Sequence, residues 1–215
     1  MVVQGVGLSK RARQHGVACR LRRIPDGLAG RQDAYHDHGM TARLDACFIL
    51  PAGPGDAAAL ARVHVQAWRE TYAGLLPIDA LHEMHAAGHA RRFTSQLMRA
   101  TPGEVILLAE GADGVIGYCA GSALPGAAEA EVFTLYLLAR AQGLGLGRRL
   151  LSACAKALMA TGAKSLRLWV LDGNARAAAF YLHLGGQRGE TRPVQGWGGG
   201  HSETVYRWAH IGLLA

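Results

Sequence analysis

The sequence has no apolar run long enough to cross a membrane, and its longest runs, such as Val105–Ala109, are only of strand length. A membrane-spanning helix needs about 20 consecutive apolar residues. The sequence therefore predicts a soluble protein that has no membrane partner. Hydrophobic residues still make up 50% of the 215 residues, which is enough to form the core of one domain plus an appendage.

Cysteine is scarce, and the four residues Cys19, Cys47, Cys119 and Cys154 show no C-x-x-C spacing. This pattern argues against a disulfide framework or a cysteine-based zinc site. It favours reduced, buried thiols in a cytoplasmic protein that needs no metal.

Histidines cluster at His82, His85 and His89, but they lack the H-E-x-x-H spacing of a zinc-binding helix. Gly88 also interrupts the helical pattern between the last two of them. The cluster favours a solvated or substrate-facing histidine surface over a metal site.

Acidic residues are outnumbered, but much of the excess positive charge lies at one end. Residues 1–40 hold seven Lys or Arg and three Asp, so this segment contributes +4 of the chain's formal net charge of +7. This segment shows no sustained periodicity, so we predict a basic, disordered extension over 1–44 and a folded domain over 45–215. A nucleic-acid-binding tail and a transit peptide are the alternatives for the extension, and Met40 is a candidate start codon. The modest charge of the folded part argues against a nucleic-acid partner as its main function.

From residue 46 onward, strand and helix patterns alternate. The helical patterns begin at Pro54, cover about 78–99 with a break near Gly88, and recur over about 145–161 and 174–183. The strand patterns cover 46–50, 105–110, 115–122, 129–138, 165–171, 187–193 and 203–209. This β-α-α-β-β-β-α-β-α-β-β order predicts a mixed α/β domain.

A glycine turn, Gln142-Gly143-Leu144-Gly145-Leu146-Gly147, lies between a predicted strand and a predicted helix. Glycine lets backbone N–H groups approach an anion closely, and a helix N-terminus adds partial positive charge. No Gly-Lys-Ser/Thr follows, which excludes a P-loop, and the spacing departs from the G-x-G-x-x-G of a dinucleotide fold. A phosphate-binding turn is the main interpretation, and a dinucleotide site or a ligand-free structural loop are the alternatives.

Three segments together resemble the GNAT superfamily, the GCN5-related N-acetyltransferases. Gln142–Gly147 is similar to its Q/R-x-x-G-x-G/A motif, and the segment Asn174–Tyr181 resembles its N-x-x-A-x-x-F-Y segment. The strand Glu131–Leu137 is similar to its fourth strand. The resemblance covers about residues 46–209, and one departure is Gly186, where the superfamily usually has Phe. It implies a central twisted mixed β-sheet flanked by helices and an acyltransferase that moves the acetyl group of acetyl-CoA directly to a primary amine.

The resemblance also implies the residues that bind the co-substrate acetyl-CoA. The backbone of Leu135, Tyr136 and Leu137 would line the pantetheine arm, and an N–H near Leu137 would meet the thioester oxygen. Asn174 would hydrogen-bond the same arm, although it can equally be only a helix N-cap. The pyrophosphate would lie on the turn formed by Gln142, Gly143, Leu144, Gly145, Leu146, Gly147 and Arg148.

Two residues are implied as catalytic. Tyr181 would protonate the leaving thiolate, and Glu131 would accept a proton from the amine, because an amine attacks only when it is neutral. A core aromatic is the alternative for Tyr181. A strand-edge carboxylate without a chemical role is the alternative for Glu131, and Glu129 on the same strand face can serve in its place.

The acceptor is a small-molecule or protein amine whose identity the sequence does not give. Trp68 and Tyr72, at the end of the first predicted helix, are candidate substrate-binding residues by resemblance, with core packing as the alternative. A homodimer is common in the superfamily. A non-catalytic acyl-CoA sensor is the alternative function, and a nucleic-acid-associated protein that uses the basic extension is a second.

Overall fold

The computed structural model describes residues 47–99, 101–194 and 200–215. The predicted extension over 1–44 lies outside the described residues. Within the described residues, no helix is long and apolar enough to span a membrane.

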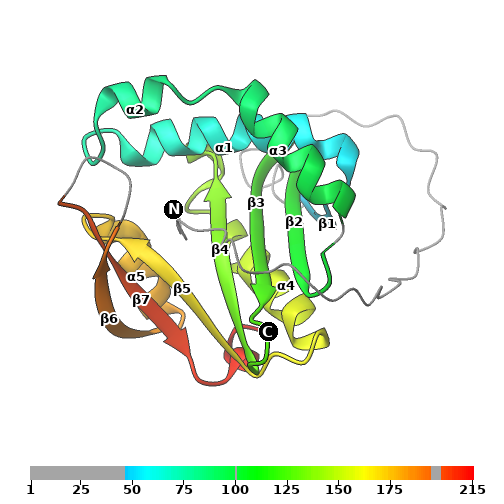
Figure 1. Ribbon diagram of the computed structural model, residues 1–215, viewed down its shortest axis with the longest axis vertical. Helices are drawn as coiled ribbons and strands as arrows, with labels where there is room; N and C mark the ends of the chain where they lie inside the picture. Colours follow the sequence, from blue (N-terminus) through cyan, green and yellow to red (C-terminus); the bar gives the residue numbers. More distant parts are fainter. Residues whose placement is uncertain (1–46, 100, 195–199) are drawn as a thin grey trace, which may run out of the picture.

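Seven strands form a single mixed sheet in the order β1-β2-β3-β4-β5-β7-β6 (Figure 1). All neighbouring strands are antiparallel except β4 and β5, which are parallel. The strands are β1 (Phe48–Pro51), β2 (Glu104–Gly111), β3 (Gly114–Ala123), β4 (Glu129–Leu137), β5 (Ser165–Leu171), β6 (Gln187–Pro193) and β7 (Ser202–Trp208). The predicted mixed α/β fold is confirmed.

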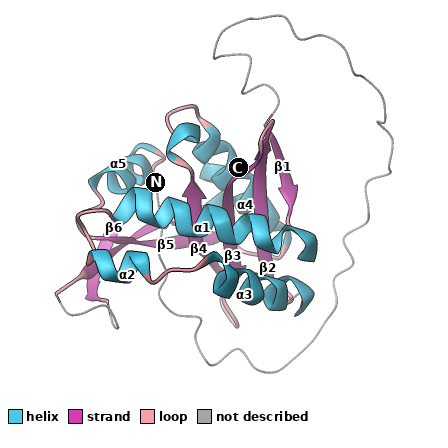
Figure 2. Ribbon diagram, turned by 90° about the horizontal axis from the view of Figure 1, so that it is seen from above, coloured by secondary structure: helices cyan, strands magenta, loops and turns pink. Residues whose placement is uncertain are grey.

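Helices cover both faces of the sheet (Figure 2). One face carries α1 (Ala57–Tyr72), α2 (Ile78–His82) and α3 (Ala86–Arg99), and the other carries α4 (Leu146–Ala160) and α5 (Ala175–His183). Two apolar cores result, one on each face, because alternate strand residues point to opposite sides. Short 3-10 helices complete the chain at Pro54–Asp56, Ala139–Ala141 and Ile211–Leu214.

Strands β4 and β5 pair over only part of their lengths. Their parallel register runs from Glu129↔Ser165 to Val132↔Leu168 and ends there, whereas β4 stays paired with β3 as far as Leu137. Figure 1 shows the two strands close together at one end and fanned apart at the other. The carboxyl-terminal part of β4 therefore has one edge without a ladder partner among the described strands.

A β-bulge in β4 accompanies this divergence. Ala120 pairs with Thr134 and Gly121 with Val132, so Phe133 is the extra residue on β4. Glycine is required opposite the bulge, because a Cβ on Gly121 would lie 2.8 Å from the carbonyl oxygen of Glu131. The bulge bends β4 where its pairing with β5 ends.

Two local expectations are changed by the structure. The helical region over about 78–99 is broken as predicted, but the break lies between α2 and α3, over residues 83–85, and Gly88 itself lies inside α3. At Gly186, where the superfamily usually has Phe, the indole of Trp208 fills the space, and a Cβ there would lie 2.7 Å from it. The aromatic ring is thus supplied by β7 instead of the residue after α5.

Candidate active site

The glycine turn leads directly into α4, as predicted. Gly143 and Gly145 have φ angles of +82° and +75°, a conformation that favours glycine. Gly145 is the N-cap of α4, and the buried side chain of Leu146 anchors the turn to the core. The sequence folds this way because two glycines in the left-handed conformation reverse the chain direction immediately before the apolar face of α4 begins.

Backbone N–H groups of this turn have no backbone acceptors within the part of the chain that the structure describes. The first such bond of α4 runs from the Arg149 N–H to the Gly145 carbonyl, at 3.1 Å. None of the N–H groups of residues 143–148 donates to a backbone carbonyl there. Free N–H groups at a helix N-terminus form an anion-binding site. The side chain of Arg148 is exposed beside them, whereas Arg149 binds the Cys47 carbonyl at 2.9 Å.

The open edge of β4 ends next to the turn. The Leu138 N–H donates to Ile116 on β3 at 3.0 Å, so by strand alternation the N–H and C=O of Leu137 point to the open side. The side chain of Gln142 donates to that Leu137 carbonyl at 2.9 Å. Gln142 therefore holds the turn against the end of β4, and the Leu137 N–H points toward the diverging strands. The Leu135 backbone shares this orientation, whereas the backbone of Tyr136 points toward β3.

Tyr181 lies on α5 and is fully buried, with no hydrogen-bond partner for its hydroxyl among the described residues. Burial raises the pKa of Tyr181 well above 10, and nearby Cys119 and Tyr136 raise it further. A buried polar atom without a partner carries a desolvation cost, which a bound ligand relieves. Tyr181 thus fits a group that acts as a neutral proton donor.

Asn174 is the N-cap of α5, because its side-chain oxygen accepts from the Ala177 N–H at 3.1 Å. The cap interpretation of this residue is therefore correct, and Asn174 is also buried. Asp172, two residues before this cap, accepts a hydrogen bond from the Thr204 hydroxyl at 2.8 Å.

Trp68 and Tyr72, the two predicted acceptor-binding residues, lie near the end of α1 with their rings 5.1 Å apart. The Trp68 indole donates to the Tyr136 hydroxyl at 2.6 Å. Tyr72 is fully buried and its hydroxyl has no hydrogen-bond partner within the described chain. Tyr72 belongs to the core under α1, and Trp68 packs against that core as a partly buried residue.

The pKa of Tyr72 lies well above 10, chiefly because of burial and then because of nearby Tyr136, Tyr181 and Glu203. Tyr72 belongs to the core on one face of the sheet and Tyr181 to the core on the other. Tyr181 is nevertheless close enough to contribute to the raised pKa of Tyr72.

Glu131 is opposite Arg167 in the parallel part of β4 and β5. Arg167 binds Glu131 at 2.8 Å and Glu129 at 3.1 Å, so the two predicted carboxylates share one guanidinium. Both glutamates lie on the strand face opposite the α4 core, because Ala130 and Val132 point into that core.

The sequence interpretation missed one buried carboxylate. Glu203 on β7 is 3% exposed and is paired with Arg192, which stacks over the ring of Trp169 at 3.6 Å. Trp169 is buried with its indole N–H unpartnered among the described residues. The sequence does contain a sign of this burial, because Glu203 and Val205 are two residues apart and therefore lie on the same face of β7.

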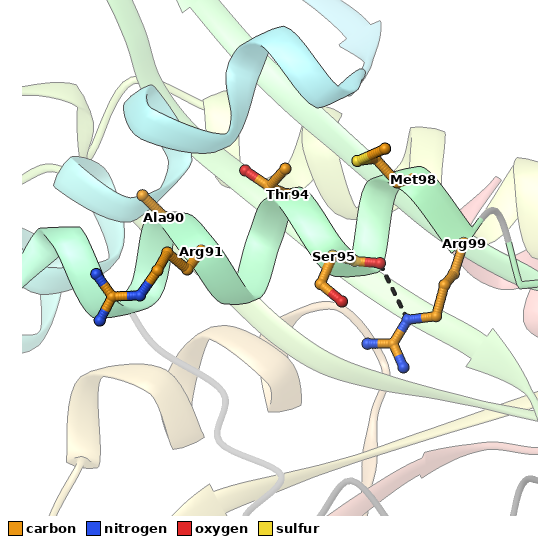
Figure 3. A pocket seen from close by; sticks show the side chains of 6 residues that line it. All are labelled: Ala90, Arg91, Thr94, Ser95, Met98 and Arg99. Atoms are coloured by element: carbon orange, nitrogen blue, oxygen red, sulfur yellow. Dashed lines mark hydrogen bonds between the residues drawn. The ribbon is translucent and has the colours of Figure 1, made fainter.

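An open hollow on the outer face of α3 lies apart from these residues (Figure 3). Its lining comes from a single helix, and the Arg99 guanidinium folds back onto the Ser95 carbonyl at 3.0 Å. It offers no paired acid and base or nucleophile, and we assign no reaction to it. The lining residues are Ala90, Arg91, Thr94, Ser95, Met98 and Arg99.

Histidines of the predicted surface cluster do not converge on one point. His89 packs against His64, with ring centroids 4.5 Å apart. Over residues 47–99, 101–194 and 200–215, no three His, Cys, Asp or Glu side chains are grouped to hold a metal ion.

Comparison with known proteins agrees with this geometry. Residues 63–185 match the model of the acetyltransferase (GNAT) family. A curated relative, the uncharacterized N-acetyltransferase YuaI of Bacillus subtilis (strain 168), is 29% identical over 118 residues. That match covers 54% of this chain and 66% of YuaI, so it spans slightly less than two thirds of the relative.

Solved structures share the fold. The PaiA N-acetyltransferase of Thermoplasma acidophilum, in complex with coenzyme A, superimposes with a TM-score of 0.64 at 21% identity, covering 75% of this chain and 99% of its own. The yncA structure of Salmonella typhimurium, with its cofactor acetyl-CoA, gives a TM-score of 0.58 at 20% identity, covering 77% and 94%.

These matches define the class of protein first: it is an acyltransferase enzyme. The chain belongs to the acetyltransferase (GNAT) family, whose members act on amine acceptors.

Proposed function

We propose that this enzyme transfers the acetyl group of acetyl-CoA directly to a primary amine, without a covalent acyl-enzyme. The observation that carries the proposal is the run of unpaired N–H groups over residues 143–148, set beside the open edge of β4. The structural relatives in complex with coenzyme A and with acetyl-CoA support the same cosubstrate.

The turn residues Gln142, Gly143, Leu144, Gly145, Leu146, Gly147 and Arg148 form the proposed pyrophosphate site. Free N–H groups and the helix dipole favour an anion there by about 0.3–2 kcal/mol before any side chain contributes. The exposed Arg148 adds a positive charge beside the turn. The backbone of Leu135 and Leu137 then offers donors and acceptors to an extended amide chain, as a neighbouring strand would.

When bound, acetyl-CoA supplies a thioester whose carbonyl oxygen gains negative charge as the amine adds. The Leu137 N–H is the proposed donor to that oxygen, because it points to the open side of β4. A preorganised donor of this kind contributes about 3–4 kcal/mol in acyl-transfer sites. The carbon–sulfur bond then breaks, and Tyr181 gives its proton to the departing thiolate. Asn174 fixes the start of α5 and thereby the position of Tyr181, which lies two turns further along.

The amine must lose a proton before it attacks. Glu131 is the proposed base, acting directly or through a water, and Glu129 is the alternative carboxylate on the same strand face. Arg167 keeps this pair of carboxylates in place on β4. Trp68 and Tyr72 are the proposed walls on the acceptor side. The predicted homodimer and cytoplasmic location stay predictions.

A panel of primary amines tests this function with the full-length chain and acetyl-CoA. We expect release of free coenzyme A thiol that depends on the amine, together with the acetylated amine detected by mass spectrometry. Tight binding of coenzyme A without turnover across the whole panel would instead identify an acyl-CoA sensor and overturn the proposal.

The phosphate site has a matched test at two glycines. Gly145 and Gly126 have similar left-handed conformations, with φ angles of +75° and +72°. An added Cβ would meet no heavy atom of the described residues within 4 Å at either position. Alanine should therefore cost each position only the backbone strain of about 1–2 kcal/mol. We expect Gly145→Ala to raise the KM for acetyl-CoA by about tenfold, because the strained backbone turns the N–H groups of the glycine turn away from the phosphate. Gly126→Ala, in the turn between β3 and β4, should lower the melting temperature similarly and leave that KM unchanged. Equal KM values for both variants would refute the phosphate site.

A further inference from the structure

Glu203 is a buried carboxylate that the proposed reaction does not use. Both contacts from Arg192 go to the same oxygen: its Nε binds Oε1 at 2.7 Å and its Nη2 binds Oε1 at 2.6 Å. Within the described chain, no side chain or backbone group donates a hydrogen bond to Oε2. One oxygen of a 3% exposed carboxylate is therefore left for a ligand.

Tyr72 supplies an independent sign of a ligand at the same place. Its hydroxyl is fully buried and has no hydrogen-bond partner among the described residues. Glu203 and Tyr181 are both near enough to raise the pKa of Tyr72, after the larger effect of burial. Leu171, which pairs with Glu203 across β5 and β7, belongs to the same core cluster as Tyr72, so the Tyr72 hydroxyl and Glu203 share one face of the sheet.

The electrostatic environment of Glu203 favours a cation. Burial raises the pKa of Glu203 most, and the carboxylates of Glu131 and Asp172 raise it further, against the lowering effect of Arg192. Four carboxylates, those of Glu129, Glu131, Asp172 and Glu203, are thus gathered here against two guanidiniums: Arg167 binds Glu129 and Glu131, and Arg192 binds Glu203. This acidic excess is local, because the chain as a whole has a formal charge of +7. A positively charged ligand group would relieve it.

Glu203 is too far from the reacting carbonyl to bind the attacking amine itself. It pairs with Leu171, three residues beyond the point where β5 leaves β4. Strand β7 is two strands away from β4, and each interstrand spacing is about 4.8 Å or more here. A group bound by Glu203 therefore belongs to a part of the acceptor several bonds away from the amine that attacks near Leu137.

We propose that Glu203 and Tyr72 bind a second, positively charged group of the acceptor, so that the preferred substrate class is a primary amine carrying a cationic group several bonds away. This inference rests on the proposed function, in which a primary amine attacks the thioester beside β4. The free Oε2 of Glu203 and the Tyr72 hydroxyl accept hydrogen bonds from the second group, and the first amine is left to react.

Three acceptors of similar length test the charge preference. They are 1,4-diaminobutane, n-butylamine and 4-aminobutyrate, whose far ends are positive, uncharged and negative. We expect kcat/KM for the diamine to exceed that for butylamine by about tenfold or more, as a charged partner in a buried site predicts, with aminobutyrate lowest. Equal values for the three acceptors in the wild-type enzyme would overturn the inference.

Glu203→Gln separates this subsite from the chemistry. It should lower kcat/KM for the diamine by about tenfold or more, mostly through KM, and change the value for butylamine by less than about threefold. The control is Glu190→Gln, since Glu190 is an exposed carboxylate on the neighbouring strand that pairs with Arg207. That control should keep the full preference for the diamine. A preference that survives Glu203→Gln contradicts the inference.

Tyr72→Phe provides a second variant that retains the buried ring. It should weaken the diamine about three- to tenfold without lowering the melting temperature, because it removes an unpaired buried hydroxyl. A merely structural Tyr72 would leave the affinity unchanged.

Calorimetric binding of 1,4-diaminobutane to the enzyme with coenzyme A gives a readout that needs no turnover. Absence of thiol release with every amine would refute the proposed function. Binding of the diamine no tighter than butylamine, or equal in wild type and in both variants, would refute this subsite.

Discussion

Two neighbouring clusters of buried aromatic side chains differ in how their polar atoms are satisfied. Under the middle of α1, His64 Nδ1 is hydrogen-bonded to the Tyr118 hydroxyl at 2.7 Å, and the Trp68 indole donates to the Tyr136 hydroxyl at 2.6 Å. Where β4 and β5 diverge, the hydroxyls of Tyr72 and Tyr181 have no partner within the described chain.

The difference is informative because the tyrosines of both clusters are equally buried: Tyr72, Tyr118, Tyr136 and Tyr181 are all 0–1% exposed. A buried polar group that is hydrogen-bonded contributes to stability, whereas one without a partner costs about 1–3 kcal/mol. A fold retains such a cost where a ligand or a reaction makes use of the group. We therefore interpret the paired hydroxyls of Tyr118 and Tyr136 as structural and the unpartnered hydroxyls of Tyr72 and Tyr181 as functional. The proposed role of the Trp68 ring as a wall of the acceptor side does not depend on this difference.

The largest expected effect comes from Tyr181→Phe, which removes only the unpartnered hydroxyl. We expect kcat with acetyl-CoA to fall by about a hundredfold or more, as the loss of a general acid predicts. The melting temperature should stay equal or rise, because no hydrogen bond within the described chain is lost. An unchanged kcat and an unchanged pH–rate profile would instead assign Tyr181 to the core, and the two clusters would no longer differ in role.

The structural cluster should make folding sensitive to acid. Burial lowers the pKa of His64 to about 3, and nearby His89 and Arg92 contribute to the shift. The unfolded chain takes up the proton near pH 6.5, so it binds more protons than the folded state between about 6.5 and 3. The contribution of His64 to stability is complete above pH 6.5 and is lost as the pH falls toward 3. Urea unfolding across this range should show a steeper decline for the wild type than for His64→Gln, and identical slopes would contradict the assignment.

A smaller effect is expected from Tyr118→Phe, the counterpart of the Tyr181 change in the other cluster. It leaves the partly buried His64 without the Tyr118 hydroxyl as its partner and should lower the free energy of unfolding by about 1–3 kcal/mol. Thiol release with a saturating amine should stay near the wild-type rate, since Tyr118 lies in the core between β3 and α1. Chemical denaturation and the acetylation assay, run on the same sample, measure both quantities. A variant that keeps its stability but loses activity would reverse the comparison.

Local signals in the sequence predicted the elements that frame the site. The glycines of the turn, the apolar face of α4 and the cap residue Asn174 act within a few residues of one another, so their roles follow from short-range geometry. The strand Ser165–Leu171 was predicted with its observed bounds for the same reason. The break in this helical region was predicted near Gly88 and not at residues 83–85, because no residue of the gap is a strong helix breaker, whereas Gly88 is tolerated inside α3.

The sequence alone determined the fold class, the family and the glycine turn before α4, because each depends on local pattern and spacing. Only the tertiary structure decided which buried side chains are paired. The hydrogen bond of His64 reaches a residue 54 positions away in the sequence, and that of Trp68 a residue 68 positions away. The pairing of β7 with β5 places Glu203 opposite Leu171. Such long-range contacts arise when the sheet assembles, so the unpartnered hydroxyls of Tyr72 and Tyr181 become visible only in the folded chain.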